Sequence, residues 1–277
     1  MTDLTAIDPL GPSPQVSKVP TGIQFQFAQS PLWVAKSSTL LFTDVPNNLI
    51  YQLTLPATAA SYRPSSAGSN GLALDPAGNL IVCELTSRQV SRREASGAYT
   101  ALASMYQGKP LNGPNDVAVR SSDGSIYFTD PQAQQLGFEG LYRIAPGSGT
   151  LTLLDQSMQY PNGLALSPDE KTLYVAAALD GKVYKFPVNA DGSLGTRRDF
   201  AQGLGSCDGV TVDDAGNVYV ATMAGVRVYK ADGTARGSLV VPEPPSNLGF
   251  GGADRRTLFI SARTSLYQVQ LQVPGRS

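Results

Sequence analysis

Six polar residues recur along the chain at similar intervals, and each begins a short run of alternating apolar residues. Their separations range from 39 to 47 residues, and each side chain carries an amide or a carboxylate. We call them the anchor residues: Gln29, Asn70, Asn115, Asn162, Asp208 and Asn247. Amide and carboxylate oxygens are donors that hard divalent cations prefer, and a carboxylate among amides is also a candidate general base. The anchor residues are therefore candidates for one site, provided that the fold brings them together.

The chain contains no histidine, which limits the chemistry of such a site. Histidine is the commonest general base near neutral pH and the commonest transition-metal ligand. Mechanisms built on Ser-His-Asp, Cys-His or paired histidines are therefore excluded. Cys83 and Cys207 fall in different repeat units, and we expect two buried thiols rather than a disulfide. Any bound metal should be held by oxygen atoms, which favours calcium, magnesium or manganese over zinc.

The segments around the anchor residues have the pattern of short β-strands. A second apolar run follows each anchor, and the second runs begin at Leu40, Leu80, Ile126, Leu173, Val218 and Leu258. Turn sequences such as DPAGN from Asp75 and DDAGN from Asp213 separate the two runs, which predicts a hairpin in each unit. A third run, with a tyrosine in five units, and a weaker fourth run follow. Four short strands per unit are typical of a propeller blade.

Six such units nearly fill the 277 residues, and a repeat of about 45 residues is typical of propellers. The sequence therefore predicts an all-β, six-bladed β-propeller with four antiparallel strands per blade. We expect residues 16–277 to form one domain, preceded by a flexible segment at residues 1–15. The last unit shows only three clear strands, whereas residues 19–27 form an alternating strand without a blade. We predict that this N-terminal strand completes the sixth blade and closes the ring.

The first strand of each blade lines the central channel of a propeller, so the anchor residues should converge at one mouth. An alternative is that the Asn-Gly and Asp-Gly pairs are only hairpin turns. The turn sequences further along each unit argue against this alternative, although Asn70 and Asn247 could serve only as backbone caps. Glu84 and Asp130 end second strands and could reach the mouth, or could be rim acids and turn caps. Phe138, Leu136 and Tyr160 could make the entrance apolar.

Charge and hydropathy exclude several classes of partner. The net charge is −1 and the longest basic run is Arg92-Arg93, so nucleic acid and acidic membranes are not expected partners. No stretch approaches the length of a membrane span, and the N-terminus lacks the pattern of a secretory signal. We expect a cytoplasmic protein that acts on a small-molecule substrate, as a monomer or a weak homo-oligomer.

Three segments resemble the family of senescence marker protein 30, gluconolactonase and luciferin-regenerating enzyme. They are residues 112–131 (NGPNDVAVRSSDGSIYFTDP), 160–176 (YPNGLALSPDEKTLYVA) and 207–221 (CDGVTVDDAGNVYVA). The resemblance implies a six-bladed propeller with one divalent cation at the channel mouth. It implies metal ligands at Asn162, in the PNG turn, and at Asp208, in the DG turn, with Asn115 of the ND pair nearby. It also places Asn112 near the substrate.

The ligand position that opens the first blade departs from the family pattern. Where the resemblance implies a glutamate that opens the first blade, this chain has Gln29. A glutamine offers one neutral carbonyl oxygen, and the charge of the ligands tunes the affinity of hard-cation sites strongly. The cofactor is therefore expected to be a divalent cation, with calcium favoured and magnesium or manganese as alternatives, or the site uses none.

The resemblance implies hydrolysis of a sugar lactone or a related small lactone or ester. The cation would polarise the carbonyl, Asp208 would act as the general base, and Asn115 would orient the substrate. Two other hypotheses stay open. A metal-free site could use Asp208 for acid-base catalysis in an isomerase, cyclase or dehydratase, or the propeller could bind a small molecule without catalysis.

Overall fold

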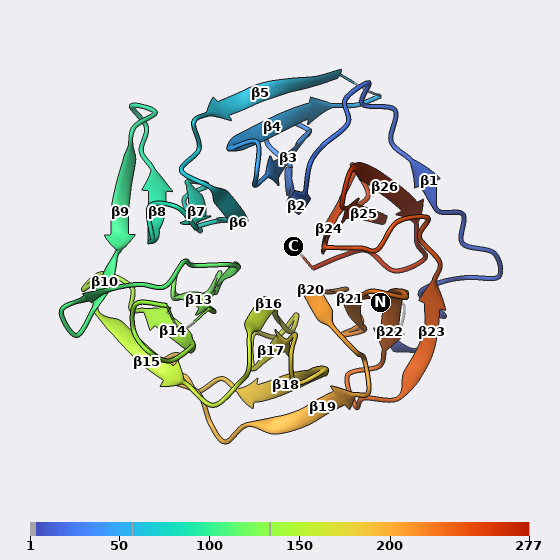
Figure 1. Cartoon of the computed structure of the whole chain (residues 1–277). Helices are drawn as coiled ribbons and strands as arrows, with labels where there is room; N and C mark the ends of the chain where they lie inside the picture. Colours follow the sequence, from blue (N-terminus) through green and yellow to red (C-terminus); the bar gives the residue numbers. More distant parts are fainter. Residues whose placement is uncertain (1–3, 57, 133, 277) are drawn as a thin grey trace.

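The computed structural model describes residues 4–56, 58–132 and 134–276. Within these residues, six four-stranded antiparallel sheets surround a central channel as the blades of a propeller (Figure 1). This arrangement confirms the predicted fold class. Blades one to three contain β2 (Ala28–Val34), β3 (Thr39–Asp44), β4 (Leu49–Thr54), β5 (Thr58–Pro64), β6 (Ser69–Leu74), β7 (Leu80–Glu84), β8 (Gln89–Arg93), β9 (Tyr99–Ala103), β12 (Val117–Val119), β13 (Ile126–Asp130), β14 (Gly140–Ile144) and β15 (Leu151–Asp155).

Blades four to six contain β16 (Pro161–Leu166), β17 (Thr172–Ala177), β18 (Lys182–Pro187), β19 (Arg198–Gln202), β20 (Cys207–Val212), β21 (Val218–Thr222), β22 (Gly225–Tyr229), β23 (Ala235–Leu239), β24 (Asn247–Gly251), β25 (Thr257–Ala262), β26 (Ser265–Gln270) and β1 (Ser17–Lys18). Outside the blades lie a short hairpin of β10 (Met105–Tyr106) and β11 (Lys109–Pro110) and a 3-10 turn at Leu4–Ala6. In the described part of the chain, no helix is long and apolar enough to cross a membrane.

The second strand of each blade is the most deeply buried, because both faces of the sheet pack against neighbouring blades. Every residue of β3, β7, β13 and β21 is buried. The two cysteines lie in this apolar interior as free thiols, as the sequence analysis expected. Burial raises the pKa of both thiols, to about 12 for Cys207, so neither is a reactive thiolate near neutral pH.

The N-terminal strand closes the ring, but it lies earlier in the chain than predicted. Ser17 and Lys18 form β1 and pair with β26, which completes the sixth blade. The prediction of a strand over residues 19–27 is wrong, because a turn at Thr21 and Gly22 interrupts it: the amide of Thr21 donates to the carbonyl of Val19, and Gly22 has a φ of 69°. Residues 19–27 still follow the edge of β26, with Val19 and Phe25 buried.

The described residues before β1 also contact the sixth blade. Leu10 is buried in the core cluster formed by blades five and six, and the carbonyl of Pro9 accepts a hydrogen bond from the amide of Gln272. The flexibility expected for residues 1–15 stays a prediction, and residues 1–3 lie outside the described residues. Removing this segment would remove the Leu10 packing, so its loss should have some cost in stability.

Candidate functional site

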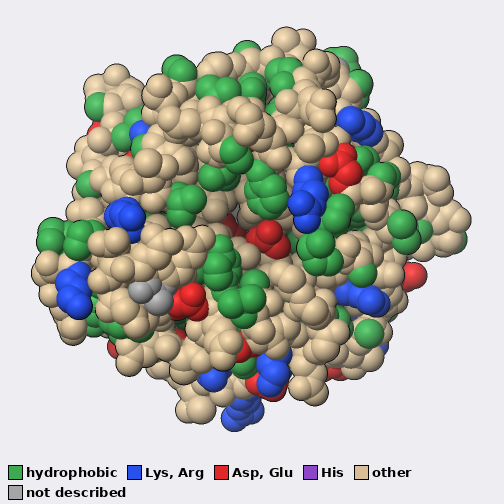
Figure 2. Space-filling view, viewed as in Figure 1, with side chains coloured by type: hydrophobic (Ala, Val, Ile, Leu, Met, Phe, Trp, Pro, Cys, Tyr) green, Lys and Arg blue, Asp and Glu red, His purple; other side chains and the backbone are tan. Residues whose placement is uncertain are grey.

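Five anchor residues lie together at one mouth of the channel, as the sequence predicted. They line a cavity of about 380 Å³ together with residues from the loops between strands. The lining residues are Gln29, Asn70, Asn115, Asn162 and Asp208 from the anchors, and Phe27, Val45, Pro46, Leu85, Gln132, Tyr160, Ala178, Leu179 and Ser206 from the surrounding segments. Figure 2 shows a hollow in the middle of this face, where acidic atoms lie at the centre and hydrophobic side chains surround them.

Local backbone irregularities direct the anchor side chains into this cavity. The antiparallel register shifts after Ser69, Pro161 and Cys207, so that Asn70, Asn162 and Asp208 each lie in a β-bulge. A bulge interrupts the regular alternation of a strand and redirects a side chain. The Asn-Gly and Asp-Gly pairs at these positions are therefore parts of strands β6, β16 and β20, and the alternative of hairpin turns is wrong.

The glycines after these anchors allow the inner strands to approach closely. A Cβ atom on Gly163 would lie 2.5 Å from the carbonyl oxygen of Asp208, and one on Gly209 would lie 2.6 Å from the Cα of Asn247. Neither glycine has a positive φ, so the close approach of the next blade, rather than a turn, requires glycine there. The spacing of the anchor residues is thus determined by contacts between the backbones of neighbouring first strands.

Asn247 does not reach this cavity, which corrects the expectation that six anchors converge. Strand β24 pairs with β25 in regular register without a bulge, so nothing redirects the Asn247 side chain towards the mouth, and it lies deeper in the channel. There its Nδ2 donates to Oδ2 of Asp116 at 3.4 Å, and its Oδ1 accepts from the amide of Leu248. Asn247 and Asp116 line a second hollow of about 320 Å³ farther along the channel.

Asp208 is the acidic residue that lines the cavity, and its environment disfavours the charged form. Burial raises its pKa to about 8, and the negative charge of Asp116 acts in the same direction. Hydrogen bonds from Gln29 and Asn162 act in the opposite direction, and Gln29 Nε2 lies 3.4 Å from Asp208 Oδ2. The carboxylate therefore lacks a cationic partner among the described residues and is held only by neutral amides.

Two buried amide oxygens beside this carboxylate have no hydrogen-bond partner in the described residues: Gln29 Oε1 and Asn162 Oδ1. A buried polar atom without a partner is costly, so a native site that retains two of them is expected to satisfy them with a ligand. In the described part of the chain, no group of three or more acidic or cysteine side chains is placed so that it could hold a metal ion. One carboxylate with several amide oxygens fits a hard divalent cation, which would be held mainly by neutral donors.

Four residues expected near the substrate do not line the cavity, because the structure uses them elsewhere. The Glu84 carboxylate accepts hydrogen bonds from Arg63, Ser87 and Ser91; burial would raise its pKa, but these bonds lower it. Asp130 accepts from the amides of Asn112 and Gly113, and burial raises its pKa to about 6. Glu84 and Asp130 are therefore buried structural carboxylates.

Asn112 and Phe138, the other two residues, are engaged with a loop that follows strand β13. The Asn112 side chain accepts from the amides of Gln135 and Leu136 and donates to the carbonyl of Phe138, so its polar atoms hold this loop together. The ring of Phe138 packs edge-on against Tyr106, and Leu136 is buried in the same core cluster. Asn112 and Phe138 thus stabilise the loop of residues 135–138, and Leu136 is not among the residues that line the cavity.

Tyr160 does line the cavity, and a neighbouring carboxylate sets its position. Glu139 accepts hydrogen bonds from the backbone amides of Gln132 and Tyr160, both of which have positive φ. Gln132 Nε2 in turn donates to the Tyr160 hydroxyl at 2.9 Å. This arrangement fixes one polar side of the cavity wall. The sequence analysis did not identify Gln132 or Asp116 as site residues. Asp116 could have been found, because it directly follows the anchor residue Asn115.

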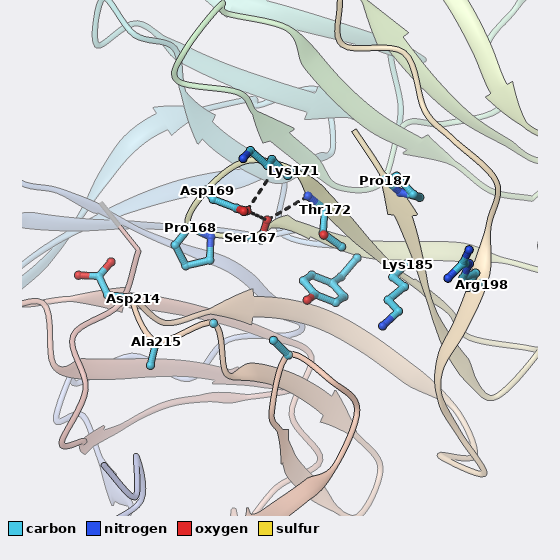
Figure 3. A pocket seen from close by; sticks show the side chains of 13 residues that line it. Ser167, Pro168, Asp169, Lys171, Thr172, Lys185, Pro187, Arg198, Asp214 and Ala215 are labelled. Atoms are coloured by element: carbon cyan, nitrogen blue, oxygen red, sulfur yellow. Dashed lines mark hydrogen bonds between the residues drawn. The ribbon is translucent and has the colours of Figure 1, made fainter. Parts of the chain in front are cut away.

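A larger hollow of about 510 Å³ lies away from the channel, between blades four and five (Figure 3). Its polar groups are largely engaged with one another: Ser167 donates to Asp169, and the amides of Lys171 and Thr172 donate to Asp169 and Ser167. Figure 3 shows these residues on one side, with Lys185 and Arg198 on the other. Because none of the described residues that line this hollow has an unpartnered buried polar atom, we place the candidate active site at the channel mouth instead.

The fold and the site define a six-bladed propeller with an amide-rich polar site at one mouth of its channel. The family model described as SMP-30/Gluconolactonase/LRE-like region matches residues 27–264. The chain therefore belongs to this family, which confirms the resemblance drawn from the three segments.

Individual relatives agree with this membership. A gluconolactonase from Zymomonas mobilis subsp. mobilis is 30% identical, over 90% of this chain and 80% of the relative. The solved structure of a gluconolactonase from Xanthomonas campestris is 31% identical, with a TM-score of 0.87 over 98% of this chain and 94% of that one. Regucalcin, a calcium-binding protein from Agrobacterium tumefaciens, shares the fold at 20% identity, with a TM-score of 0.80 over 94% of this chain and 95% of that one.

Proposed function

We propose that the protein is a lactonase-like hydrolase that opens the ring of a sugar lactone or a related small lactone or ester at this channel mouth. The observation that carries the proposal is the convergence of Asp208 with the unpartnered oxygens of Gln29 and Asn162 in one cavity. Family membership and the relatives named as gluconolactonases support the reaction class. The proposed substrate is a small molecule that fits a volume of about 380 Å³.

The donor set suits a divalent cation held by Asp208, Asn162, Gln29 and Asn115, with calcium favoured and magnesium or manganese as alternatives. The chemistry that such a cation supplies is Lewis-acid polarisation of the ester carbonyl. In the proposed reaction, Asp208 takes a proton from water as the water oxygen bonds to the carbonyl carbon. The ring C–O bond then breaks, and the departing alkoxide receives that proton back from Asp208, which yields a hydroxy acid and regenerates the carboxylate. Asn115, which lines the same cavity from the third blade, orients the substrate.

A second candidate function rests on the pKa of Asp208. A carboxyl group with a pKa of about 8 can both donate and accept a proton near neutral pH, which suits a metal-free isomerase, cyclase or dehydratase. The two functions differ in their need for a cation. Elemental analysis and calorimetry with calcium, magnesium and manganese, followed by a lactone panel in a pH-stat, test the proposal. Binding at one cation per chain with cation-dependent ring opening supports it, and ring opening without a cation contradicts the metal-assisted form.

The variant Gln29→Glu should strengthen cation binding. It places a second carboxylate beside Asp208, and the gross attraction of one further carboxylate at 4 Å is on the order of 4 kcal/mol for each unit of cation charge at an effective dielectric constant of 20. The cost of desolvating the added carboxylate offsets most of this attraction. We therefore expect Kd for calcium to fall by about 10- to 100-fold, since ligand charge tunes such sites over orders of magnitude. Without a cation, the two carboxylates repel each other, and the melting temperature should decrease.

The matched control is Gln24→Glu, which adds the same charge at an exposed position of the same segment. This control should change neither the affinity for cations nor the melting temperature in chelator. An unchanged calcium affinity in Gln29→Glu would argue that the first-blade position serves other chemistry, and the metal-free candidate would then be favoured.

A further inference from the structure

The walls of the cavity differ in chemistry from its floor. The floor consists of the amide and carboxylate anchor residues, whereas six apolar residues form what we call the apolar wall: Phe27, Val45, Pro46, Leu85, Ala178 and Leu179. These residues come from blades one, two and four, so the apolar wall faces the cavity from more than one direction. The site therefore combines a small polar floor with a largely apolar entrance.

The polar residues of the wall are Gln132, Tyr160 and Ser206. Gln132 donates to the Tyr160 hydroxyl and accepts from Gln134 at 3.3 Å, so both ends of its amide are engaged. Asp208 is the one charged side chain among the described residues that line the cavity. A ring with several hydroxyl groups would leave some of them against apolar surface without partners, and this desolvation is unfavourable.

The apolar wall continues onto the surface around the mouth. Leu179 is 69% exposed, and Met223, 55% exposed, lies at a smaller adjoining hollow of about 50 Å³. This hollow shares Phe27, Ser206 and Asp208 with the cavity. Its other lining residues, besides Met223, are Thr222, Pro244, Pro245, Ser246 and Arg263, so its apolar side is formed by Phe27, Met223 and the two prolines. Large apolar side chains that remain exposed beside a polar site commonly mark a binding surface. Figure 2 shows hydrophobic side chains, in green, around the central hollow.

We propose that the substrate is a lactone that carries an apolar alkyl or aryl substituent, rather than a polyhydroxylated sugar lactone. The ester group lies on the floor beside Asp208, and the substituent lies along the apolar wall towards Leu179 and Met223. This proposal rests on the proposed lactone hydrolysis, and it adds the substrate class. Each methylene that becomes buried on the wall should raise kcat/KM by up to about four-fold, until the wall is covered.

The test compares δ-valerolactone with δ-lactones that carry alkyl chains of increasing length, and with glucono-δ-lactone after subtraction of its spontaneous hydrolysis. We expect kcat/KM to rise with chain length and to exceed the value for glucono-δ-lactone. In Leu179→Asp, the dependence on chain length should become weaker. Val240→Asp is the matched control, since Val240 is an 80% exposed apolar residue that does not line the cavity, and the dependence should persist there.

Two results would overturn the proposal: a higher kcat/KM for glucono-δ-lactone than for every alkyl lactone, or the same chain-length dependence in wild type and Leu179→Asp. If no lactone is hydrolysed, the proposed function fails, and binding still tests the substrate class. Alkyl-substituted δ-lactams are ring analogues that resist hydrolysis, and calorimetry should show tighter binding with chain length in wild type and a smaller gain in Leu179→Asp. Equal affinities for all lactams would refute the role of the apolar wall.

Discussion

Replacing Asp208 by asparagine is expected to lower kcat/KM for lactone hydrolysis by about a thousand-fold, within the range that a general base contributes. Asparagine keeps the shape of the side chain and one carbonyl oxygen, but it cannot accept the proton from water. The variant should also bind calcium more weakly, because it removes the charged donor of the cavity. Steady-state kinetics and calorimetry on the purified variant measure both effects.

The same variant should be more stable than wild type at pH 8 to 9 when divalent cations are absent. An aspartate has a pKa near 3.8 in the unfolded chain, whereas burial raises the pKa of Asp208 to about 8 in the folded state. Between these values the folded state binds a proton that the unfolded state has released, so stability falls as the pH rises and the loss is complete above about pH 8. Asparagine is neutral at every pH and escapes this loss.

The size of the gain is limited because Asp208 is partly open to the cavity. We expect about 2 to 4 kcal/mol, or roughly 5 °C in melting temperature for a domain of this size. At pH 4 the difference should vanish. Asp232→Asn, at an exposed turn aspartate, is the control and should bring no gain at high pH. Wild-type activity in Asp208→Asn would refute the assignment of the site, and a lower melting temperature at pH 9 would refute the electrostatic argument.

Deleting residues 1–27 is expected to abolish cooperative folding. The deletion removes β1, which leaves the edge of β26 unpaired, and it removes Val19 and Phe25, which are 1% and 2% exposed. Loss of a buried phenylalanine alone costs about 3 to 5 kcal/mol, and an unpaired edge strand promotes aggregation. Calorimetry and near-UV circular dichroism should show no cooperative transition for this variant.

Deletion of residues 1–14 is the control, since it keeps β1 and the segment that follows it. That variant should melt cooperatively at a moderately lower temperature, because it loses the packing of Leu10 and the hydrogen bond between Pro9 and Gln272. A sharp transition after removal of residues 1–27 would mean that three strands suffice for the sixth blade.

The architecture was predictable because the alternation of apolar residues and the repeat of the anchors are properties of the sequence itself. The convergence of Gln29, Asn70, Asn115, Asn162 and Asp208 followed from the propeller geometry. The convergence of Asn247 with the other anchors was predicted wrongly, because a strand pattern does not reveal a β-bulge and β24 lacks the bulge that redirects Asn70, Asn162 and Asp208. The alternative that Asn247 binds only backbone agrees with the hydrogen bond that its Oδ1 accepts from the amide of Leu248.

The hydrogen-bond partners of Glu84 and Asp130 could not be predicted from the sequence either. Glu84 and Asp130 end second strands as expected, but whether such a carboxylate faces a cavity or its own loop depends on contacts with Arg63 and with the amides of Asn112 and Gly113. These contacts join residues that are 17 to 21 positions apart in the chain. The alternation of strands does not determine such contacts.

The glycines that follow the anchors have an evolutionary consequence. Because backbone contacts at Gly163 and Gly209 determine how closely the inner strands approach, the radius of the polar floor does not depend on which side chains stand at the anchor positions. A mutation from glutamate to glutamine, or from aspartate to asparagine, then changes the charge of the floor without changing its size. Single substitutions at the anchor positions can therefore change the affinity for cations and the specificity of a propeller site without rebuilding the scaffold, and Gln29 is a position at which such a change would act.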